Sequence, residues 1–203
     1  MASDRRIGGP DAKNRSVLLD AAEELMLEDG YAAVTSRRVA DRAGLKPQLV
    51  HYYFRTMDEM FIEVFRRRAT QGLDAQAKAL DSPQPLWALW DFGTDPAATR
   101  LTMEFMGLAN HRKALRAEIA LYAERFRAQQ VEAITAALRR YGYEVSDVPP
   151  VVWGVFATSV SQVLVMEQAL GMSAGHAEML TFCEGWLRRL EGERAPVATT
   201  ASA

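Results

Sequence analysis

The side chains best suited to chemistry in this chain lie in one short stretch, residues 35–55, where basic, amide and aromatic residues alternate with small apolar ones. Arginine and lysine neutralise phosphates, and glutamine can pair with the N6 and N7 atoms of adenine. A nucleic acid is therefore the ligand that this stretch favours. The residues that we expect to contact it are Arg37, Arg38, Lys46, Pro47, Gln48, His51, Tyr52 and Arg55.

The elements that must hold these side chains are two short helices joined by a tight turn. Thr35 is a good N-cap for the first helix, which we expect to extend to residue 43. Gly44 reaches the positive φ of a sharp turn without strain. Pro47 suits the first turn of the second helix, 47–54, because an amide at that position would have no helical partner. This order is typical of a helix-turn-helix, whose second helix enters the major groove of DNA.

Within this motif we expect the three arginines to face phosphates and the exposed side chains of the second helix to face the groove. The alternative interpretation is a solvated charged face on a small helical domain, which a pair of arginines alone does not exclude. His51 is a poor candidate for a metal ligand, because no second ligand lies three or four residues away. We expect it to contact the groove or a phosphate.

The composition is that of an ordinary globular protein: 203 residues, 49% hydrophobic and 25% charged. The net charge is −2, so any attraction to DNA must come from local clustering of cations. The single cysteine, Cys183, excludes an internal disulfide and indicates a reducing compartment. We expect no membrane span and no signal peptide, because we find no sufficiently long apolar run. The predicted location is the cytoplasm.

Two other classes of function find less support in the sequence. An enzyme would need a nucleophile elbow, a phosphate-binding glycine loop or a metal-ligand spacing, and none of these motifs occurs. We therefore predict no catalytic residue, no metal and no cofactor. A structural or protein-interaction module would not need a helix-turn-helix beside a basic N-terminal arm.

The remaining sequence predicts long helices without strand alternation. We expect a flexible arm over residues 1–11, a helix over about 12–29 and, with the helix-turn-helix, a three-helix DNA-binding domain over 12–55. A second domain, 56–192, would be a helical bundle that begins at a capping box formed by Thr56 and Glu59. Its helices are expected at about 56–80, 85–92, 97–110, 113–141, 151–170 and 176–190, followed by a disordered tail over 193–203. The predicted fold is all-α with about nine helices.

The N-terminal residues resemble the TetR family of bacterial transcriptional regulators. The resemblance covers about residues 12–65 and rests on an alanine-rich first helix, a Gly-Tyr pair, Thr35, Val39-Ala40, Ala43-Gly44-Leu45, an aromatic cluster ending in Phe54 and the helix start at Thr56. His51 stands where the family commonly has tyrosine, and Met57 where a lysine usually reaches a phosphate. The resemblance implies a homodimer that binds a palindromic operator on double-stranded DNA and, in most members, represses transcription until a small effector binds.

The resemblance also implies an effector cavity and a dimer interface in the second domain. Apolar candidates for the cavity favour a hydrophobic effector, although the same residues also suit ordinary core packing: Trp87, Trp90, Met103, Met106, Tyr122, Phe126, Trp153 and Phe156. Helix 151–170 is nearly uncharged and must be covered on several sides, either by a second subunit or within one subunit. The candidates for a dimer interface are Val152, Val160, Val163, Met179, Cys183 and Trp186.

Overall fold

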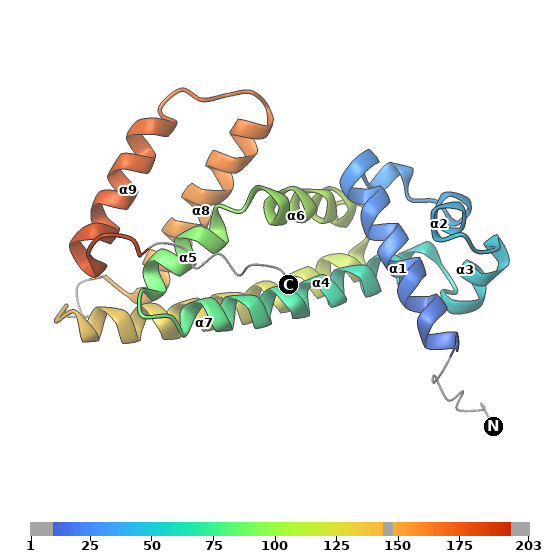
Figure 1. Cartoon of the computed structure of the whole chain (residues 1–203), viewed down its shortest axis with the longest axis horizontal. Coiled ribbons are helices and arrows are strands. Elements are labelled where there is room, and N and C mark those ends of the chain that lie inside the picture. Colours follow the sequence, from blue (N-terminus) through green and yellow to red (C-terminus); the bar gives the residue numbers. More distant parts are fainter. Residues whose placement is uncertain (1–9, 144–147, 196–203) are drawn as a thin grey trace. The chain divides into compact units, whose positions relative to one another are not determined.

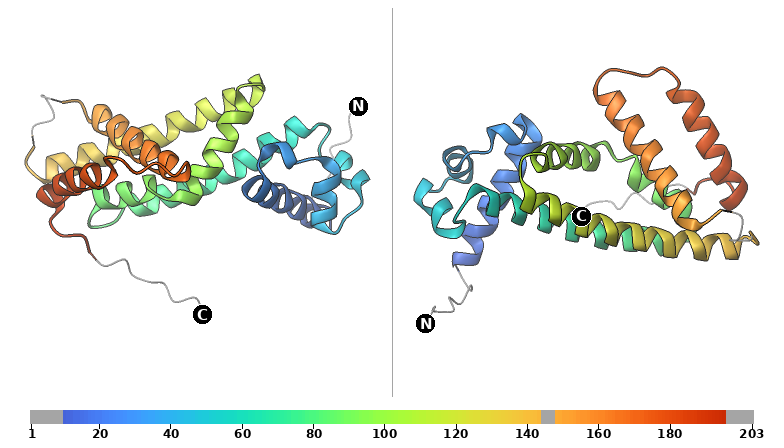
Figure 2. Two further views of the ribbon diagram at one scale, coloured as in Figure 1. Left: turned by 90° about the horizontal axis from the view of Figure 1, so that it is seen from above. Right: turned by 180° about the vertical axis from the view of Figure 1, so that it is seen from behind.

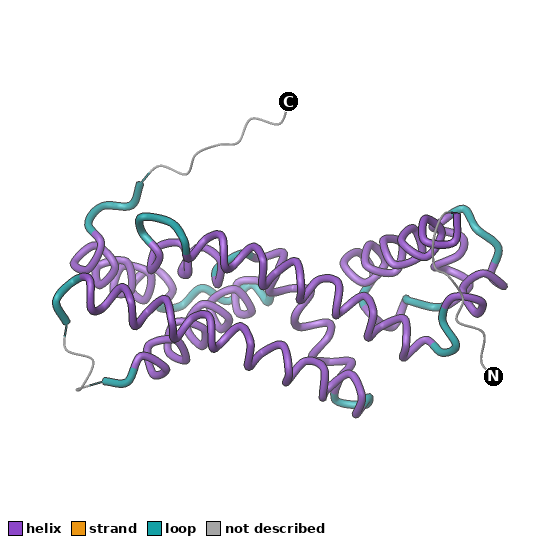
Figure 3. Tube along the Cα trace, turned by 90° about the horizontal axis from the view of Figure 1, so that it is seen from below, coloured by secondary structure: helices purple, strands orange, loops and turns teal. Residues whose placement is uncertain are grey.

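The computed structural model describes residues 10–143 and 148–195, in which every regular element is a helix (Figure 1). The all-α prediction is therefore confirmed, and Figure 3 shows only helices and loops over these residues. The described residues form nine α-helices and one 3-10 helix: α1 (Pro10–Asp29), η1 (Tyr31–Ala33), α2 (Ser36–Ala43), α3 (Pro47–Tyr53), α4 (Met57–Leu80), α5 (Pro85–Gly93), α6 (Pro96–Ala109), α7 (Lys113–Arg140), α8 (Pro150–Ala169) and α9 (His176–Glu191).

The described residues fall into two compact units. Among the described residues, the N-terminal unit contains 10–71 together with Arg100–Tyr122, and the C-terminal unit contains Gly72–Thr99, 123–143 and 148–195. This division differs from the expected one at residue 56, because the first half of α4, most of α6 and the start of α7 share a core with α1–α3. The three helices of the DNA-binding motif thus do not enclose a core on their own.

The core of the N-terminal unit is built from the apolar faces that the sequence predicts. Leu18, Leu25 and Met26 of α1 are at most 2% exposed and pack with residues of α2, α3 and α4. From α6 and α7, the same core includes Phe105 and Leu115. Burial of these side chains supplies most of the free energy that holds the short helices α2 and α3 in place.

The core of the C-terminal unit consists of two small clusters. One joins α5 to α7 through Leu86, Leu89 and Ile134, and the other joins α5 to α9 through Trp87, Trp90 and Cys183. A Cβ atom on Gly93 would lie 2.8 Å from the Ser161 hydroxyl oxygen, so α5 and α8 approach each other closely at this point. An exposed turn joins α8 to α9 (Figure 2).

Helix α8 departs from the expectation that no segment could cross a membrane. Its 20 residues have a mean hydropathy of 1.3, and by length and composition alone the helix could span a bilayer. Its composition allows this because Glu167, near the end of the helix, is the only charged residue in it. Only 17% of the apolar window is buried in the subunit. A single helix of this kind is weak evidence for a membrane span. Its exposed apolar side chains instead indicate a surface that another protein or a membrane shields from water.

The boundaries of the expected N-terminal arm and C-terminal tail differ from those in the structure. Helix α1 begins at Pro10, two residues earlier than expected, because proline is well suited to the first turn of a helix. Of the expected arm, residues 1–9 lie outside the described residues, as do residues 196–203 of the expected tail. Residues 193–195 are held in place: the Ala195 amide donates to Gln84 over 2.8 Å, and Arg194 pairs with Asp91 over 2.5 Å.

Candidate nucleic-acid interface

Helix α2 begins and ends at the residues that the sequence singles out. The Thr35 hydroxyl accepts a hydrogen bond from the Arg38 amide over 3.3 Å, as an N-cap does. At the other end Gly44 adopts φ 64°, and no atom lies within 4 Å of the position that a Cβ would take. The backbone conformation, and not crowding, therefore requires glycine there. The turn closes with the Leu45 amide bonded to the Ala40 carbonyl over 2.9 Å.

Helix α3 presents one polar face to solvent and anchors the other in the core. Pro47 occupies its first turn, and Val50 and Phe54 are each 1% exposed. On the outer face Lys46, Pro47, Gln48, His51 and Tyr52 are all exposed. The Tyr52 ring stands edge-on to that of Tyr53, with centroids 5.0 Å apart. Arg15 braces the anchored side, since its guanidinium lies over the Phe54 ring at 5.3 Å and pairs with Glu63 of α4 over 2.6 Å.

The arginines of α2 differ in how freely they could reach a phosphate. The Arg37 side chain is 87% exposed, and its only carboxylate neighbour among the described residues is Asp41, at 4.0 Å. Arg38 pairs instead with Asp29 at the end of α1, over 2.5 Å. Both side chains are exposed, but a phosphate would have to compete with Asp29 for Arg38. Arg37 is thus the more available cation.

Arg42 serves the packing of α2 on α1. Its guanidinium donates to Glu28 over 2.6 Å and to Glu24 over 3.2 Å. These hydrogen bonds raise the pKa of Arg42 above its usual value, and the bond from Arg42 lowers the pKa of Glu28. The acidic residues of α1 were not recognised as partners from sequence, although Glu24 and Glu28 lie four residues apart on one helix face.

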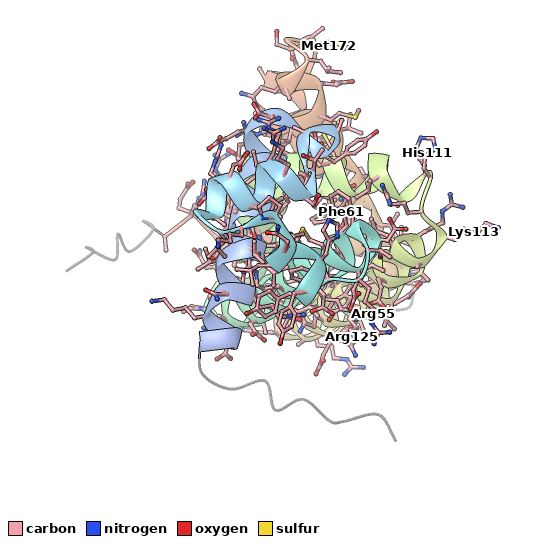
Figure 4. The ribbon with its side chains drawn as sticks, turned by 90° about the vertical axis from the view of Figure 1, so that its right-hand side faces the viewer. Arg55, Phe61, His111, Lys113, Arg125 and Met172 are labelled. Carbon is pink, nitrogen blue, oxygen red and sulfur yellow. The ribbon has the colours of Figure 1, made fainter. Side chains whose placement is uncertain are left out.

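The start of α4 forms the expected capping box in a slightly shifted form. The Thr56 hydroxyl accepts from the Glu59 amide over 3.1 Å, and the Glu59 carboxylate reaches back to the Arg55 amide over 2.9 Å. Arg55 is exposed just before α4, whereas Phe61 in the first turns of that helix is buried, at 2% exposure; Figure 4 labels both residues. Within residues 10–143 and 148–195, neither Lys46 nor Arg55 takes part in an ion pair, which leaves both side chains available to an anion.

The residues predicted to line an effector cavity are divided between the two units. Met103, Met106 and Tyr122 belong to the N-terminal unit, and the first two are 38% and 55% exposed. Tyr122 exchanges a hydrogen bond with Thr70, and its ring packs edge-on against Phe65. The other five candidates belong to the C-terminal unit, where Trp87 and Trp90 are core residues, Phe126 packs on Phe92, Trp153 lies beside Trp186 and Phe156 is 42% exposed.

The residues predicted for a dimer interface divide into exposed and internal ones. Val152, Val163, Met179 and Trp186 are between 37% and 49% exposed on α8 and α9. Val160 packs against the cluster of Trp87 and Trp90, and Cys183 belongs to that cluster with 6% exposure. Burial raises the pKa of the Cys183 thiol. Several further apolar side chains extend the exposed set: Val151, Val155, Phe156, Leu170, Met172, Leu180 and Phe182.

A polar network inside the C-terminal unit escaped the sequence analysis. Gln76 of α4 is fully buried; it donates to Gln129 over 2.9 Å and accepts from Gln130 over 3.2 Å. Arg127 of α7 donates to Gln130 over 3.1 Å and to Thr158 of α8 over 3.3 Å. The sequence feature that could have predicted this network is the presence of amide and hydroxyl residues in helices whose facing sides are otherwise apolar.

A helix-turn-helix whose second helix has one polar, exposed face, flanked by exposed cations, is characteristic of DNA-binding proteins. The comparisons with known proteins identify its family. A model of the family "Bacterial regulatory proteins, tetR family" matches residues 18–64. The chain is 26% identical over 137 residues, 63% of its length, to the HTH-type transcriptional regulator BetI of Rhizobium meliloti (strain 1021), of which it covers 68%.

Solved structures share the fold at lower sequence identity. A transcriptional regulator from Saccharomonospora viridis in complex with choline has a TM-score of 0.75 at 16% identity, covering 90% of this chain and 100% of that one. A TetR transcription regulator from Haloarcula marismortui has a TM-score of 0.72 at 16% identity, with 88% and 98% covered. The helix-turn-helix region of the chain, residues 18–64, is that of the TetR family of transcriptional regulators, a family of DNA-binding proteins that are not enzymes.

Proposed function

We propose that the protein is a ligand-responsive repressor of the cytoplasm that binds a palindromic operator as a homodimer and is released by a small hydrophobic effector. The observation that carries this proposal is the exposed face of α3, where Lys46, Gln48 and His51 project from a helix anchored by two buried residues. Gln48 can read adenine. Arg55, and Arg37 with its long 4.0 Å contact to Asp41, can neutralise flanking phosphates.

The dimer is supported by the exposed apolar face of α8 and α9. Side chains such as Val163, Phe182 and Trp186 are 37–54% exposed in the subunit. Exposed apolar side chains on two helices are costly in water, and a two-fold copy of the same pair would cover them as a four-helix interface. Two recognition helices related in this way would bind successive major grooves, about 34–36 Å apart. The effector would act by favouring a dimer in which this separation no longer fits the DNA.

Binding to the DNA upstream of the chain's own gene tests the proposal. Fluorescence anisotropy should show sequence-specific binding that weakens steeply with salt, and sedimentation should show a dimer both free and on the operator. A protein that remains monomeric, or binds upstream and unrelated DNA equally well, would contradict it. Cell fractionation tests the alternative that a membrane, and not a second subunit, surrounds α8. Recovery of the full chain in the membrane fraction would contradict a cytoplasmic dimer.

The effector is tested by release from the same DNA. Choline is a useful first ligand, because the structurally similar regulator from Saccharomonospora viridis was solved in complex with it. Apolar and amphipathic metabolites form the second group, as the aromatic residues of the C-terminal unit favour them. Equal operator affinity in the presence and absence of every compound would argue against ligand control.

A further inference from the structure

Arg127 is a partly buried cation whose hydrogen-bond partners are all neutral. Its Nη1 donates to the Gln130 side-chain oxygen over 3.1 Å and to the Thr158 hydroxyl over 3.3 Å. The Thr158 hydroxyl in turn donates to the Gly154 carbonyl over 2.8 Å, so it meets Arg127 as an acceptor. In the described part of the chain, no Asp or Glu carboxylate forms an ion pair with Arg127. This contrasts with Arg38, Arg42 and Arg66, each of which is paired.

The network behind Arg127 holds its position without neutralising its charge. Gln130 is bonded to Gln76, whose side chain is fully buried and also donates to the Phe126 carbonyl over 3.2 Å. On the other side, a Cβ atom on Gly154 would lie 3.1 Å from Arg127 Nη1, so the guanidinium lies against the backbone of α8. Amide side chains can orient a guanidinium, but only an anion can compensate a charge removed from water.

The geometry points to an anion. We propose that Arg127 is the anchor for an acidic effector, whose carboxylate or phosphate group pairs with the guanidinium in the C-terminal unit. This inference rests on the proposed ligand-responsive function and specifies the chemistry of the effector. Only Nη1 of Arg127 is engaged within residues 10–143 and 148–195, so Nε and Nη2 retain donors for a forked hydrogen-bonded pair with an oxyanion.

The surroundings of Arg127 favour an amphipathic acid over a bare inorganic anion. The apolar side chain of Ile134 lies beside it, because a Cβ atom on Gly154 would lie 3.1 Å from Arg127 Nη1 and 3.6 Å from Ile134 Cδ1. Small-molecule sites combine such apolar walls with a few placed polar groups. The ligand class is therefore an organic acid with an aliphatic or aromatic body, which keeps the hydrophobic character expected from sequence and adds a negative charge.

The test compares two organic acids with their neutral amides and with cationic compounds. Octanoate and phenylacetate are the anionic probes, octanamide and phenylacetamide are their neutral counterparts, and octyltrimethylammonium and choline are cationic. Calorimetric titration of the full-length protein should show binding of at least one acid and much weaker binding of its amide. Arg127→Gln should weaken acid binding about 10- to 100-fold, as expected for loss of a charge-assisted hydrogen bond. Arg139→Gln, on the exposed end of α7, is the matched control and should bind as the wild type does.

A second measurement separates ligand anchoring from a purely structural role. Without ligand, Arg127→Gln should melt at the same or a higher temperature than the wild type, because it removes an uncompensated charge. A melting temperature several degrees lower would assign Arg127 to structure instead. The proposal is also overturned if amides bind as well as acids, if only the cationic probes bind, or if no acid binds at millimolar concentration. Release from the operator by an amide or a cation would reject this inference while leaving the ligand-responsive function intact.

Discussion

The carboxylate of Glu104, in α6, accepts a hydrogen bond from the backbone amide of Tyr31 over 2.7 Å. Tyr31 opens the 3-10 helix η1, whose N-cap, Gly30, has no side chain to offer and adopts φ 80°. A residue 73 positions further along the chain therefore caps the segment that links α1 to α2. Nearby, a Cβ atom on Gly107 would lie 3.4 Å from the Tyr31 ring. Helix α6 thus supports the entrance to the DNA-binding motif.

Replacing Glu104 should loosen this entrance. Glu104→Ala leaves a partly buried amide without its acceptor, and we expect the free energy of unfolding to fall by about 1–3 kcal/mol. Hydrogen exchange of the Tyr31 amide should become faster, and operator affinity should fall because α2 is held less firmly. Glu104→Gln keeps an acceptor and should have a smaller effect.

Glu132→Ala is the control for this change, since Glu132 is exposed on α7 in the other unit. It should alter neither the exchange rate nor the operator affinity. If Glu104→Ala leaves the Tyr31 amide as well protected as in the wild type, the cap has no role in the stability of the linker.

The proposed base-reading and phosphate-binding residues should respond differently to substitution. Gln48→Ala should cost about 1–3 kcal/mol on the preferred operator and relax specificity at one position, since an amide pairs specifically with adenine. Arg37→Gln should weaken binding to all sequences and lower the salt slope by about 1. Arg42→Gln is the matched control. Because Arg42 forms ion pairs with Glu24 and Glu28, its substitution should leave the salt slope unchanged. Equal slopes for Arg37→Gln and the wild type would exclude a phosphate contact by Arg37.

The sequence predicts the helix-turn-helix well because its signals are local. Thr35, Gly44 and Pro47 each determine a helix end or a turn through their own backbone or side chain, and the structure confirms each of these positions. The interactions that sequence reasoning missed join distant segments. Asp29 forms an ion pair with Arg38, and Glu104 accepts a hydrogen bond from the Tyr31 amide. Nothing in the spacing of these residues along the chain predicts either contact.

Composition alone does not separate residues that line a cavity from residues that fill a core. Of the aromatic and methionine candidates for a cavity, Trp87 and Trp90 are 2% and 6% exposed in a packed cluster. The sequence does not predict the polar network around Arg127, because amide and hydroxyl side chains carry no period that separates a buried position from a solvated one. Only the contacts in three dimensions distinguish them.

Charge placed on the exposed apolar face should separate the proposed dimer. Val163 of α8 and Phe182 of α9 are 44% and 54% exposed in the subunit. The double substitution Val163→Glu and Phe182→Glu would bury two uncompensated carboxylates in the interface, so we expect a monomer by light scattering and a large loss of operator affinity. Ala136→Glu adds one such carboxylate at an exposed position of α7 and should remain dimeric. A dimer that persists with both substitutions would place the interface elsewhere.

Tyr141 should make the C-terminal unit sensitive to alkali. Its hydroxyl donates to Glu191 over 2.9 Å, and the same carboxylate accepts from the Leu86 and Trp87 amides at the start of α5. Burial, followed by the hydrogen bond to Glu191 and its negative charge, raises the pKa of Tyr141 to about 12. The folded state therefore holds the phenolic proton more tightly than the unfolded chain, in which the pKa is about 10.

The sign of the pH effect follows from this difference. The stabilisation is fully present below pH 10 and is lost as the pH rises from about 10 to about 12, because the unfolded state then binds fewer protons than the folded state. Tyr141→Phe removes the titrating group, so the wild type should exceed this variant in free energy of unfolding by an amount that is constant below pH 9 and shrinks above pH 10. Denaturant titrations from pH 8 to pH 11 measure that difference, and Tyr143→Phe, at an exposed position, is the control. A difference that stays constant over this range would show that Tyr141 releases its proton equally readily in both states.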